Sequence, residues 1–168
     1  SMGVLAYGGL RFAPELPPAQ DEAIHNLPMG LLTKIPLEIK GNRLGLKPFD
    51  DILIERHGHH DVYFLCFPFD CDLIVGFVGG DFAWELSAAG EAAAVDFAVQ
   101  SLTRSFGSDL EKRIGRTAMT DWGANPFTRG AYAAARPGFA GARKALMEPV
   151  GERIFFAGEA LGGALVQT

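Results

Sequence analysis

Short apolar runs rich in aromatic and β-branched residues recur through the first half of the chain, where they predict strands. The runs lie at 30–39, 51–56, 61–67 and 72–80. Such residues pack well on a pleated surface, so each run is expected to form one strand. The last run, DLIVGFVGG, is apolar almost throughout, which is typical of a strand at the centre of a sheet.

Apolar residues then return every three or four positions between 81 and 106, which predicts helix over that whole segment. Gly107 follows directly and is expected to end it, because glycine readily adopts the conformation that closes a helix. The apolar face of this predicted helix comprises Ala94, Phe97, Ala98, Ser101 and Leu102. Shorter helices are expected before Pro28 and around 140–147.

The last third of the chain predicts a late strand at 114–122, a loop at 123–138 and a closing strand at 152–158. Strands and helices therefore do not alternate regularly, which argues against a doubly wound nucleotide-binding fold. The glycine-rich fingerprint G-x-G-x-x-G is also absent after the predicted strands. We expect an α+β fold, with a mixed and largely antiparallel sheet flanked by helices, in a single domain over residues 1–168.

Composition and charge narrow the range of partners. The 168 residues are 48% hydrophobic and 21% charged, which is typical of an ordered globular domain with a buried core. The net charge of −5 provides no basic surface for nucleic acid. No apolar run reaches membrane-spanning length and no secretory signal is evident, so a cytoplasmic protein without a membrane partner is expected.

Two groups of residues are candidates for chemistry. Lys34 interrupts an apolar strand, where an unpaired ammonium is costly, so it must be paired, exposed at a sheet edge or functional. An ordinary lysine on an edge strand is the simplest of these interpretations. The second group, Asp121, Trp122, Arg129 and Tyr132, gathers polar and large aromatic side chains around a loop punctuated by glycine and proline, where function is more common than core packing.

Histidines and cysteines are weaker candidates. The segment ERHGHHD sets His57, His59 and His60 between two carboxylates. Adjacent histidines of an extended chain point to opposite faces, so a solvated hairpin loop is expected there, with no metal. Cys66 and Cys71 flank a predicted turn, and both are expected to be reduced and buried.

Four motifs together resemble the flavin-containing amine oxidase family, which includes monoamine oxidases, polyamine oxidases and flavin-dependent histone lysine demethylases. The motifs are MGLLTKIPL, GFVGGDFAWEL, TDWGANPFTRGAYAAARPG and ERIFFAGEA. The resemblance is strongest at 27–37 and 74–168. It implies that this chain is the substrate-binding portion of a larger, truncated FAD-dependent enzyme, that residues 153–168 contact FAD, and that the family's Rossmann half is missing.

The resemblance also implies roles for single residues. Lys34 matches the lysine that holds a water beside flavin N5, and Tyr132 matches one wall of the aromatic cage on the flavin face. These two positions are therefore expected to be catalytic.

Four further positions match residues that contact the cofactor. Trp122 matches a tryptophan packed near the isoalloxazine ring, and Gly158 and Glu159 match the segment that contacts the ribityl and phosphate part of FAD. By its spacing from Glu159, Thr168 takes the place of the second cage wall.

Two positions depart from the family pattern. Ala131 stands where monoamine oxidases carry the cysteine that bonds flavin covalently, so FAD is expected to bind without a covalent link. Thr168 is not aromatic, so the two-tyrosine cage is incomplete, which favours polyamines or longer amines.

The implied activity is oxidative deamination of an amine, with hydride transfer to flavin and reoxidation by O2. The isolated chain is expected to bind no FAD and to be inactive, because it lacks a phosphate-binding glycine loop. A flavin-free binding module or inactive remnant remains an alternative, as does a related FAD-dependent desaturase or protoporphyrinogen oxidase.

An apolar side left open by the missing half also predicts a homodimer through the flavin-facing side. The apolar residues expected on that side are Phe155, Phe156, Leu161, Leu165 and Val166.

Overall fold

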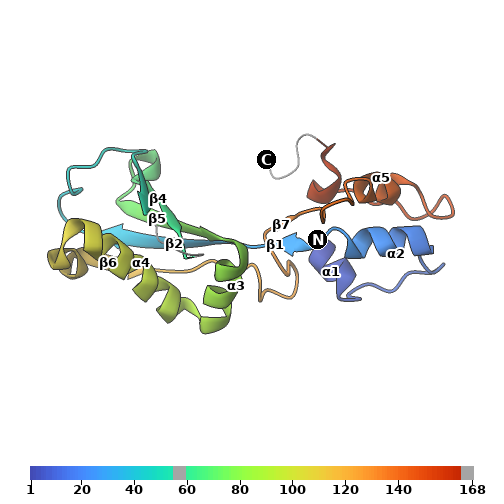
Figure 1. Cartoon of the computed structure of the whole chain (residues 1–168), viewed down its shortest axis with the longest axis horizontal. Helices are drawn as coiled ribbons and strands as arrows, with labels where there is room; N and C mark the ends of the chain where they lie inside the picture. The colour runs from blue at the N-terminus through green and yellow to red at the C-terminus, as the bar shows by residue number, and fades with distance from the viewer. Residues whose placement is uncertain (55–59, 164–168) are drawn as a thin grey trace. The chain divides into compact units, whose positions relative to one another are not determined.

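The computed structural model describes residues 1–54 and 60–163, and the chain divides into two compact units (Figure 1). The sheet unit comprises Leu32–Asp121. The helical unit joins Ser1–Leu31 to the chain from Trp122 onward. The sheet unit is thus one continuous segment, whereas the helical unit depends on packing between two segments that are distant in sequence.

The sheet unit contains a five-stranded sheet in the order β3-β4-β5-β2-β6. Its strands are β2 (Leu32–Ile39), β3 (Asp51–Ile54), β4 (Val62–Cys66), β5 (Leu73–Gly79) and β6 (Ile114–Thr117). Each neighbouring pair is antiparallel. The expectation of a largely antiparallel sheet is confirmed, and the most apolar run, β5, occupies its centre.

One face of this sheet forms the core. The register places Ile35 of β2, Gly76 of β5 and Phe64 of β4 side by side on that face. The fully buried members of this face include Ile35, Leu37, Val62, Phe64, Ile74 and Val78. Helices α3 (Gly80–Ala89) and α4 (Glu91–Phe106) pack against it (Figure 1). Each large apolar side chain buried in this way contributes roughly 1.5–3 kcal/mol.

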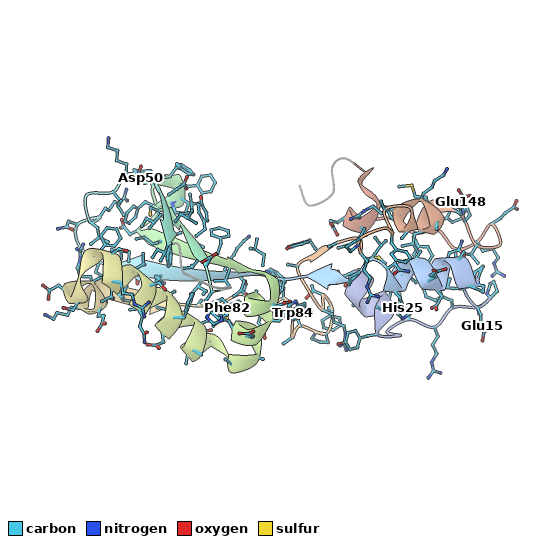
Figure 2. All side chains as sticks on the ribbon, in the orientation of Figure 1. Glu15, His25, Asp50, Phe82, Trp84 and Glu148 are labelled. Carbon is cyan, nitrogen blue, oxygen red and sulfur yellow. The ribbon has the colours of Figure 1, made fainter. Side chains whose placement is uncertain are left out.

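The segment predicted as one helix is in fact two. It breaks at Gly90, whose φ of 91° is accessible to glycine at little cost and ends the hydrogen-bonded ladder of α3. The apolar face of α4 lies where the periodicity placed it, with Ala94, Ala98 and Leu102 buried and Gly107 at the C-cap. Phe97 is half-buried and packs edge-on against Phe82 of α3, labelled in Figure 2, at 4.8 Å between ring centroids.

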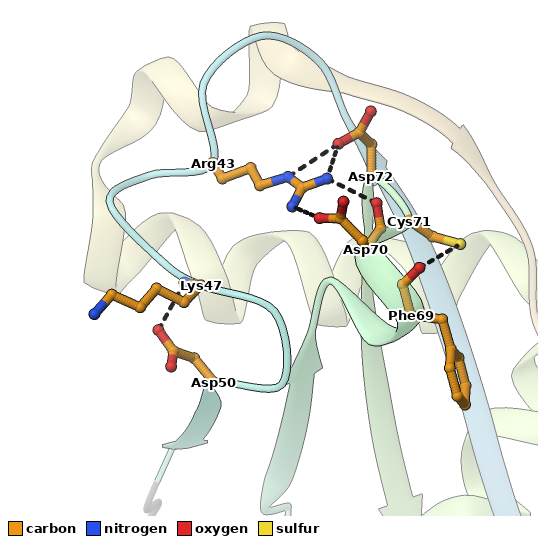
Figure 3. Close-up of polar contacts among 7 residues, drawn as sticks. All are labelled: Arg43, Lys47, Asp50, Phe69, Asp70, Cys71 and Asp72. Atoms are coloured by element: carbon orange, nitrogen blue, oxygen red, sulfur yellow. Dashed lines mark hydrogen bonds and ion pairs between the residues drawn. The ribbon is translucent and has the colours of Figure 1, made fainter.

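Beyond one end of the sheet, Arg43 connects the loop after β2 to the turn between β4 and β5 (Figure 3). Its guanidinium donates to Asp70 and, at 2.8 and 3.1 Å, to Asp72 Oδ1, and it lies 4.8 Å from the Phe67 ring centroid. The hydrogen bonds to both carboxylates raise the pKa of Arg43. Phe49, Phe67 and other non-glycine residues here have positive φ. Such conformations persist only where surrounding contacts enforce them, and Arg43 supplies contacts to two of these residues, the ring of Phe67 and the side chain and carbonyl of Asp70.

The helical unit is built from short elements. They are α1 (Met2–Ala6), α2 (Pro18–His25), β1 (Met29–Gly30), β7 (Tyr132–Ala133), α5 (Ala142–Met147) and a 3₁₀ turn at Glu159–Leu161. Strands β1 and β7 pair antiparallel. Its core includes Met2, Ala23, Ile24, Leu27 and Leu146, drawn from α1, α2 and α5 and the segment that follows α2. The helices predicted before Pro28 and around 140–147 are both present.

The closing strand predicted at 152–158 is absent. Gly151 and Glu152 have φ values of 58° and 55°, so the chain reverses there and leaves a single bridge between Val150 and Ile154. Residues 155–158 belong to no strand, and Phe155 is 69% exposed. Elsewhere the predicted loop contains β7, and the late strand is shorter than predicted.

The two cysteines are in different environments, so the expectation that both are buried is wrong for one of them. Cys66 is free and fully buried in β4, and burial raises the pKa of its thiol from 9.0 to about 11. Cys71 is free and exposed after the 3₁₀ turn Pro68–Asp70.

Within the described residues, no helix has both the length and the apolar character that crossing a bilayer requires.

Candidate functional site

Lys34 lies on an interior strand, between β5 and β6, and not on an edge strand. Its side chain is exposed on the sheet face opposite α3 and α4, directly across from Phe77 of β5. Its main-chain N–H donates to Thr120 Oγ1 at 2.9 Å, and its carbonyl accepts from the Thr120 N–H at 3.0 Å. Both main-chain polar groups of Lys34 are therefore bonded to Thr120.

The sheet face that carries Lys34, which we term the open face, is apolar apart from a few polar groups. Strand alternation brings to it Pro36, Leu53, Tyr63, Leu65, Leu73, Val75 and Phe77, together with the carboxylates of Glu38 and Asp51. None of these side chains is fully buried, whereas the corresponding positions on the other face mostly are. An ammonium on this face thus stands beside apolar surface that the described residues leave accessible.

Tyr132 owes its orientation to a glycine. Strands β1 and β7 pair Gly30 with Tyr132, and the tyrosine ring lies over the glycine. A Cβ at position 30 would stand 2.5 Å from Tyr132 Cε2, which is closer than such atoms approach. The absence of a side chain at position 30 therefore makes room for the ring.

The loop that carries Trp122 is closed by hydrogen bonds to the Trp122 carbonyl, which accepts from Thr128 Oγ1 at 2.7 Å and from the Gly130 N–H at 2.8 Å. The Trp122 side chain is 43% exposed. In the same unit, the Arg129 guanidinium lies 4.1 Å from the Tyr7 ring centroid. Of the predicted loop group, Asp121 belongs instead to the sheet unit and accepts a hydrogen bond from Ser87.

Gly158 and Glu159 are held next to β7. The Ala133 N–H donates to Glu159 Oε2 at 3.1 Å, and Arg143 donates to the carbonyls of Ala133 and Ala160. Gly158 has a φ of 142°, and a Cβ added to it would meet no atom within 4 Å. The structure thus brings the Tyr132 strand and the Gly158–Glu159 turn together, as the sequence alone did not.

A cavity of about 260 Å³ lies beside this turn, within the helical unit. Its walls include Met2, Leu5, Met29, Leu146 and Phe156, which are apolar, together with Gly158 and Glu159. Apolar walls suit an aromatic ring system, the open backbone at Gly158 allows close approach, and the Glu159 carboxylate accepts hydrogen bonds from hydroxyl groups. These residues fit a ring and a hydroxyl-bearing chain such as those of FAD, although a carboxylate is a poor partner for a phosphate.

The remaining predicted positions are distributed as follows. Lys34 belongs to the sheet unit, Tyr132 and Trp122 to the helical unit, and Thr168 lies outside the described residues. Of the apolar residues expected on the flavin-facing side, Phe155 is exposed, whereas Phe156 and Leu161 pack against the core of the helical unit. Leu165 and Val166 lie outside the described residues.

The histidine segment is only partly described, because residues 55–59, and with them His57 and His59, lie outside the described residues. The imidazole of His60 stacks on Phe82 at 4.2 Å between ring centroids and lies 3.8 Å from the Glu85 carboxylate. Across residues 1–54 and 60–163, no three histidine, cysteine or acidic side chains are grouped so as to hold a metal ion.

Sequence reasoning missed Gly30 and Arg143. The only signal for Gly30 was its place as the first residue of an apolar run, two residues before β2 and four before Lys34. Arg143 gave no signal, because an arginine in a short helix is normally solvated. Both act through contacts with residues that are distant in the sequence.

Comparison with known proteins agrees with the motifs. The family model described as flavin containing amine oxidoreductase matches residues 1–168, and the chain belongs to this family. It is 32% identical over 176 residues to lysine-specific histone demethylase 1 homolog 1 of Oryza sativa subsp. japonica, covering 95% of this chain and 20% of that protein. It is 29% identical to lysine-specific histone demethylase 1 homolog 3 of Arabidopsis thaliana, covering 98% of this chain and 11% of that protein.

The fold agrees with that of a solved amine oxidase. The structure is similar to cyclohexylamine oxidase from Brevibacterium oxydans IH-35A, with a TM-score of 0.64 and 22% sequence identity over 96% of this chain and 36% of that one. The chain spans about a fifth or less of the two plant relatives described above. The predicted family resemblance is therefore confirmed, as is the α+β fold.

Proposed function

We propose that this chain forms part of an FAD-dependent amine oxidoreductase and supplies residues to both the substrate and the flavin. Family membership supports the reaction class, since the family is described as flavin containing amine oxidoreductase. The observation that carries the proposal is Lys34, an ammonium on an interior strand that faces accessible apolar surface. An exposed ammonium on this face can reach a group that binds over it.

Bound FAD supplies the acceptor for a hydride from the carbon next to the amine nitrogen. When bound FAD covers this face, Lys34 would hold a water next to the flavin ring and would stabilise negative charge there, because a cation shielded from bulk water acts more strongly than one in water.

Three residues of the helical unit complete the proposal. Tyr132 forms one wall beside the amine, with its ring fixed over Gly30. Glu159 keeps one carboxylate oxygen on the Ala133 N–H, which leaves the other to accept a hydrogen bond from a hydroxyl of the cofactor. Trp122 packs near the flavin ring, and its backbone is held by the closed loop.

The substrate is proposed to be a polyamine or another long amine. Thr168 would stand where a second aromatic wall is needed to clamp a small arylalkyl amine, and a threonine provides no such wall. The FAD is proposed to be non-covalent, since Ala131 has no thiol to bond it. Screening amines of increasing length against the flavin-loaded protein tests the substrate class.

The decisive experiment replaces Lys34 with methionine in the longest protein that contains this chain and binds FAD. We expect oxygen-dependent turnover to fall by at least tenfold while bound FAD, measured by its visible absorbance, is unchanged. The matched control is Lys40→Met, an exposed lysine at the end of the same strand, which should retain the parent rate. Turnover of Lys34→Met within twofold of the parent would refute the role given to Lys34.

FAD binding by residues 1–168 alone is a second part of the proposal. The sequence lacks G-x-G-x-x-G, so chain 1–168 alone is proposed to bind no FAD and to be inactive. Stoichiometric visible absorbance of the purified chain would contradict this. The lack of G-x-G-x-x-G is also compatible with one alternative, a flavin-free binding module. Such a module would remain colourless even when joined to a dinucleotide-binding domain.

The chain is also proposed to form a homodimer through the side that is proposed to face FAD. Exposure of Phe155 supports an apolar surface in the helical unit. Light scattering over a range of concentrations should report a dimer for the parent and a monomer for Phe155→Glu. A parent that stays monomeric at high concentration would rule the dimer out.

A further inference from the structure

A row of side chains crosses the open face from the Lys34 strand to the far edge of the sheet. The register sets Lys34 of β2 against Phe77 of β5, and Phe77 against Tyr63 of β4. The Tyr63 hydroxyl donates to Asp51 of β3. Asp51 lies diagonally across from Tyr63 on the same face, two residues from Leu53, which pairs with Tyr63 directly. Four neighbouring strands therefore each contribute one member of a continuous row.

The contact at the Lys34 end is between a cation and an aromatic ring. Lys34 Nζ lies 5.8 Å from the centroid of the Phe77 ring, within the range in which an ammonium is attracted to the negative face of an aromatic ring. Within the described part of the chain, no carboxylate lies within ion-pair distance of this ammonium. The ring of Phe77 is thus the group that attracts it.

The rest of the row fixes the Phe77 ring. Phe77 stands on the central strand, and the Tyr63 ring packs on it at 5.6 Å between centroids with the two planes tilted by 56°. Tyr63 is in turn held by its hydrogen bond to Asp51, which also raises the pKa of the Tyr63 hydroxyl and keeps it a donor. Because the ring cannot move freely, the ammonium it attracts is confined as well.

We propose that Phe77 is a positioning residue for Lys34, confining the ammonium to one place on the open face through its ring, with Tyr63 and Asp51 as its support. The contacts that position Lys34 do not depend on the proposed function, but the reason for positioning it does rest on that function. An ammonium that holds a water beside the flavin must itself stay in one place. A lysine side chain has four rotatable bonds and would otherwise sample many positions in water. The aliphatic neighbours Pro36 and Val75 offer no such attraction.

The test uses the protein as it is, without flavin. The five lysines and the amino terminus are dimethylated with ¹³C, which retains their positive charge, and the methyl resonances are recorded by NMR. Lys34→Arg identifies the Lys34 signal by its loss. We expect that signal to be displaced upfield from those of the exposed lysines by the ring current of Phe77.

The variants separate positioning from packing. Phe77→Leu keeps an apolar side chain but removes the ring, so the Lys34 signal should move to the position of the exposed lysines, and Phe77→Tyr should restore the displacement. Tyr63→Leu should reduce it, and Phe69→Leu, which alters an 85% exposed ring elsewhere, should leave it unchanged. A Lys34 signal in the parent without upfield displacement would overturn the proposal even if Phe77→Leu fails to fold.

The outcome is independent of the kinetic test of Lys34. A displaced signal that Phe77→Leu abolishes, together with unchanged turnover of Lys34→Met, would sustain the positioning and refute the catalytic role. An undisplaced signal together with slow turnover of Lys34→Met would refute the positioning and sustain the catalytic role.

Discussion

The sheet unit and the helical unit place their proposed functional residues by different means. In the sheet unit, the face on which Lys34 lies follows from strand alternation, because neighbouring positions such as Ile35 are fully buried under the helices. In the helical unit, Tyr132 sits on a strand of two residues, and its ring is placed by the missing side chain of Gly30. Regular structure therefore sets the first position, whereas specific contacts between distant segments set the second.

The difference has energetic consequences. The sheet unit depends on large buried side chains, whose removal leaves a cavity, and it tolerates changes on its open face. The helical unit has fewer and smaller buried groups and depends on close approach of backbones and on side chains that bond to carbonyls. Mutations should accordingly be most costly at core positions of the first unit and at contact positions of the second.

The largest effect is expected from Phe64→Ala. Phe64 is fully buried between the sheet and its helices, so truncation should lower the free energy of unfolding by about 3–5 kcal/mol. Leu53→Ala, on the open face with the side chain 65% exposed, is the control and should cost about 0.5 kcal/mol or less. Urea unfolding followed by circular dichroism measures both, and equal costs would contradict the one-sided core.

A smaller loss is expected from Gly30→Ala in the helical unit. The added Cβ would stand 2.5 Å from the Tyr132 ring, and the overpacking should cost about 1–3 kcal/mol. Gly141→Ala is the matched control, because its Cβ would meet nothing within 4 Å and its φ is −68°, so that change should stabilise by roughly 0.4–1 kcal/mol.

A second substitution tests the cause. If the clash with the ring is responsible, Tyr132→Ala should abolish most of the extra cost of Gly30→Ala in the double variant. Additive losses would instead mean that position 30 matters for another reason, such as the pairing of β1 with β7.

Arg143→Met should have a more modest effect. It removes the donors to the carbonyls of Ala133 and Ala160, and partly buried carbonyls left without partners cost about 1–2 kcal/mol. Hydrogen exchange at the Ala133 N–H, which bonds to Glu159, should become faster. Arg153→Met, at an exposed arginine in the same unit, serves as the control and should leave both quantities unchanged.

The smallest effect on stability concerns the two thiols and pH. Burial raises the pKa of Cys66 to about 11, so at about pH 8 iodoacetamide should modify Cys71 alone in the folded protein and both cysteines after unfolding. Because the folded pKa is raised, this contribution to stability is fully present below pH 9.0 and is lost as the pH rises towards about 11. Mass spectrometry of the alkylated peptides checks the first statement, and modification of Cys66 in the folded state would contradict it.

Much of the sheet unit could be predicted from its pattern. The apolar runs gave the four early strands, and the three- to four-residue repeat gave the buried face of α4, because burial on one face imposes these periods on the sequence. The break at Gly90 was missed, since apolar residues continue on both sides of it and only the backbone angle separates the helices.

The sequence by itself determined the family and the antiparallel sheet, and it pointed to Lys34 and Tyr132 as candidate residues. These could be predicted because periodic burial and short motifs involve residues that are close together in the sequence. Tertiary structure alone decided that Lys34 stands on an interior strand beside Phe77, that Tyr132 lies over Gly30, and that residues 152–158 turn back instead of extending. The physical reason is that strand order, ring orientation and close backbone approach depend on which distant segments meet, and no local pattern encodes that meeting.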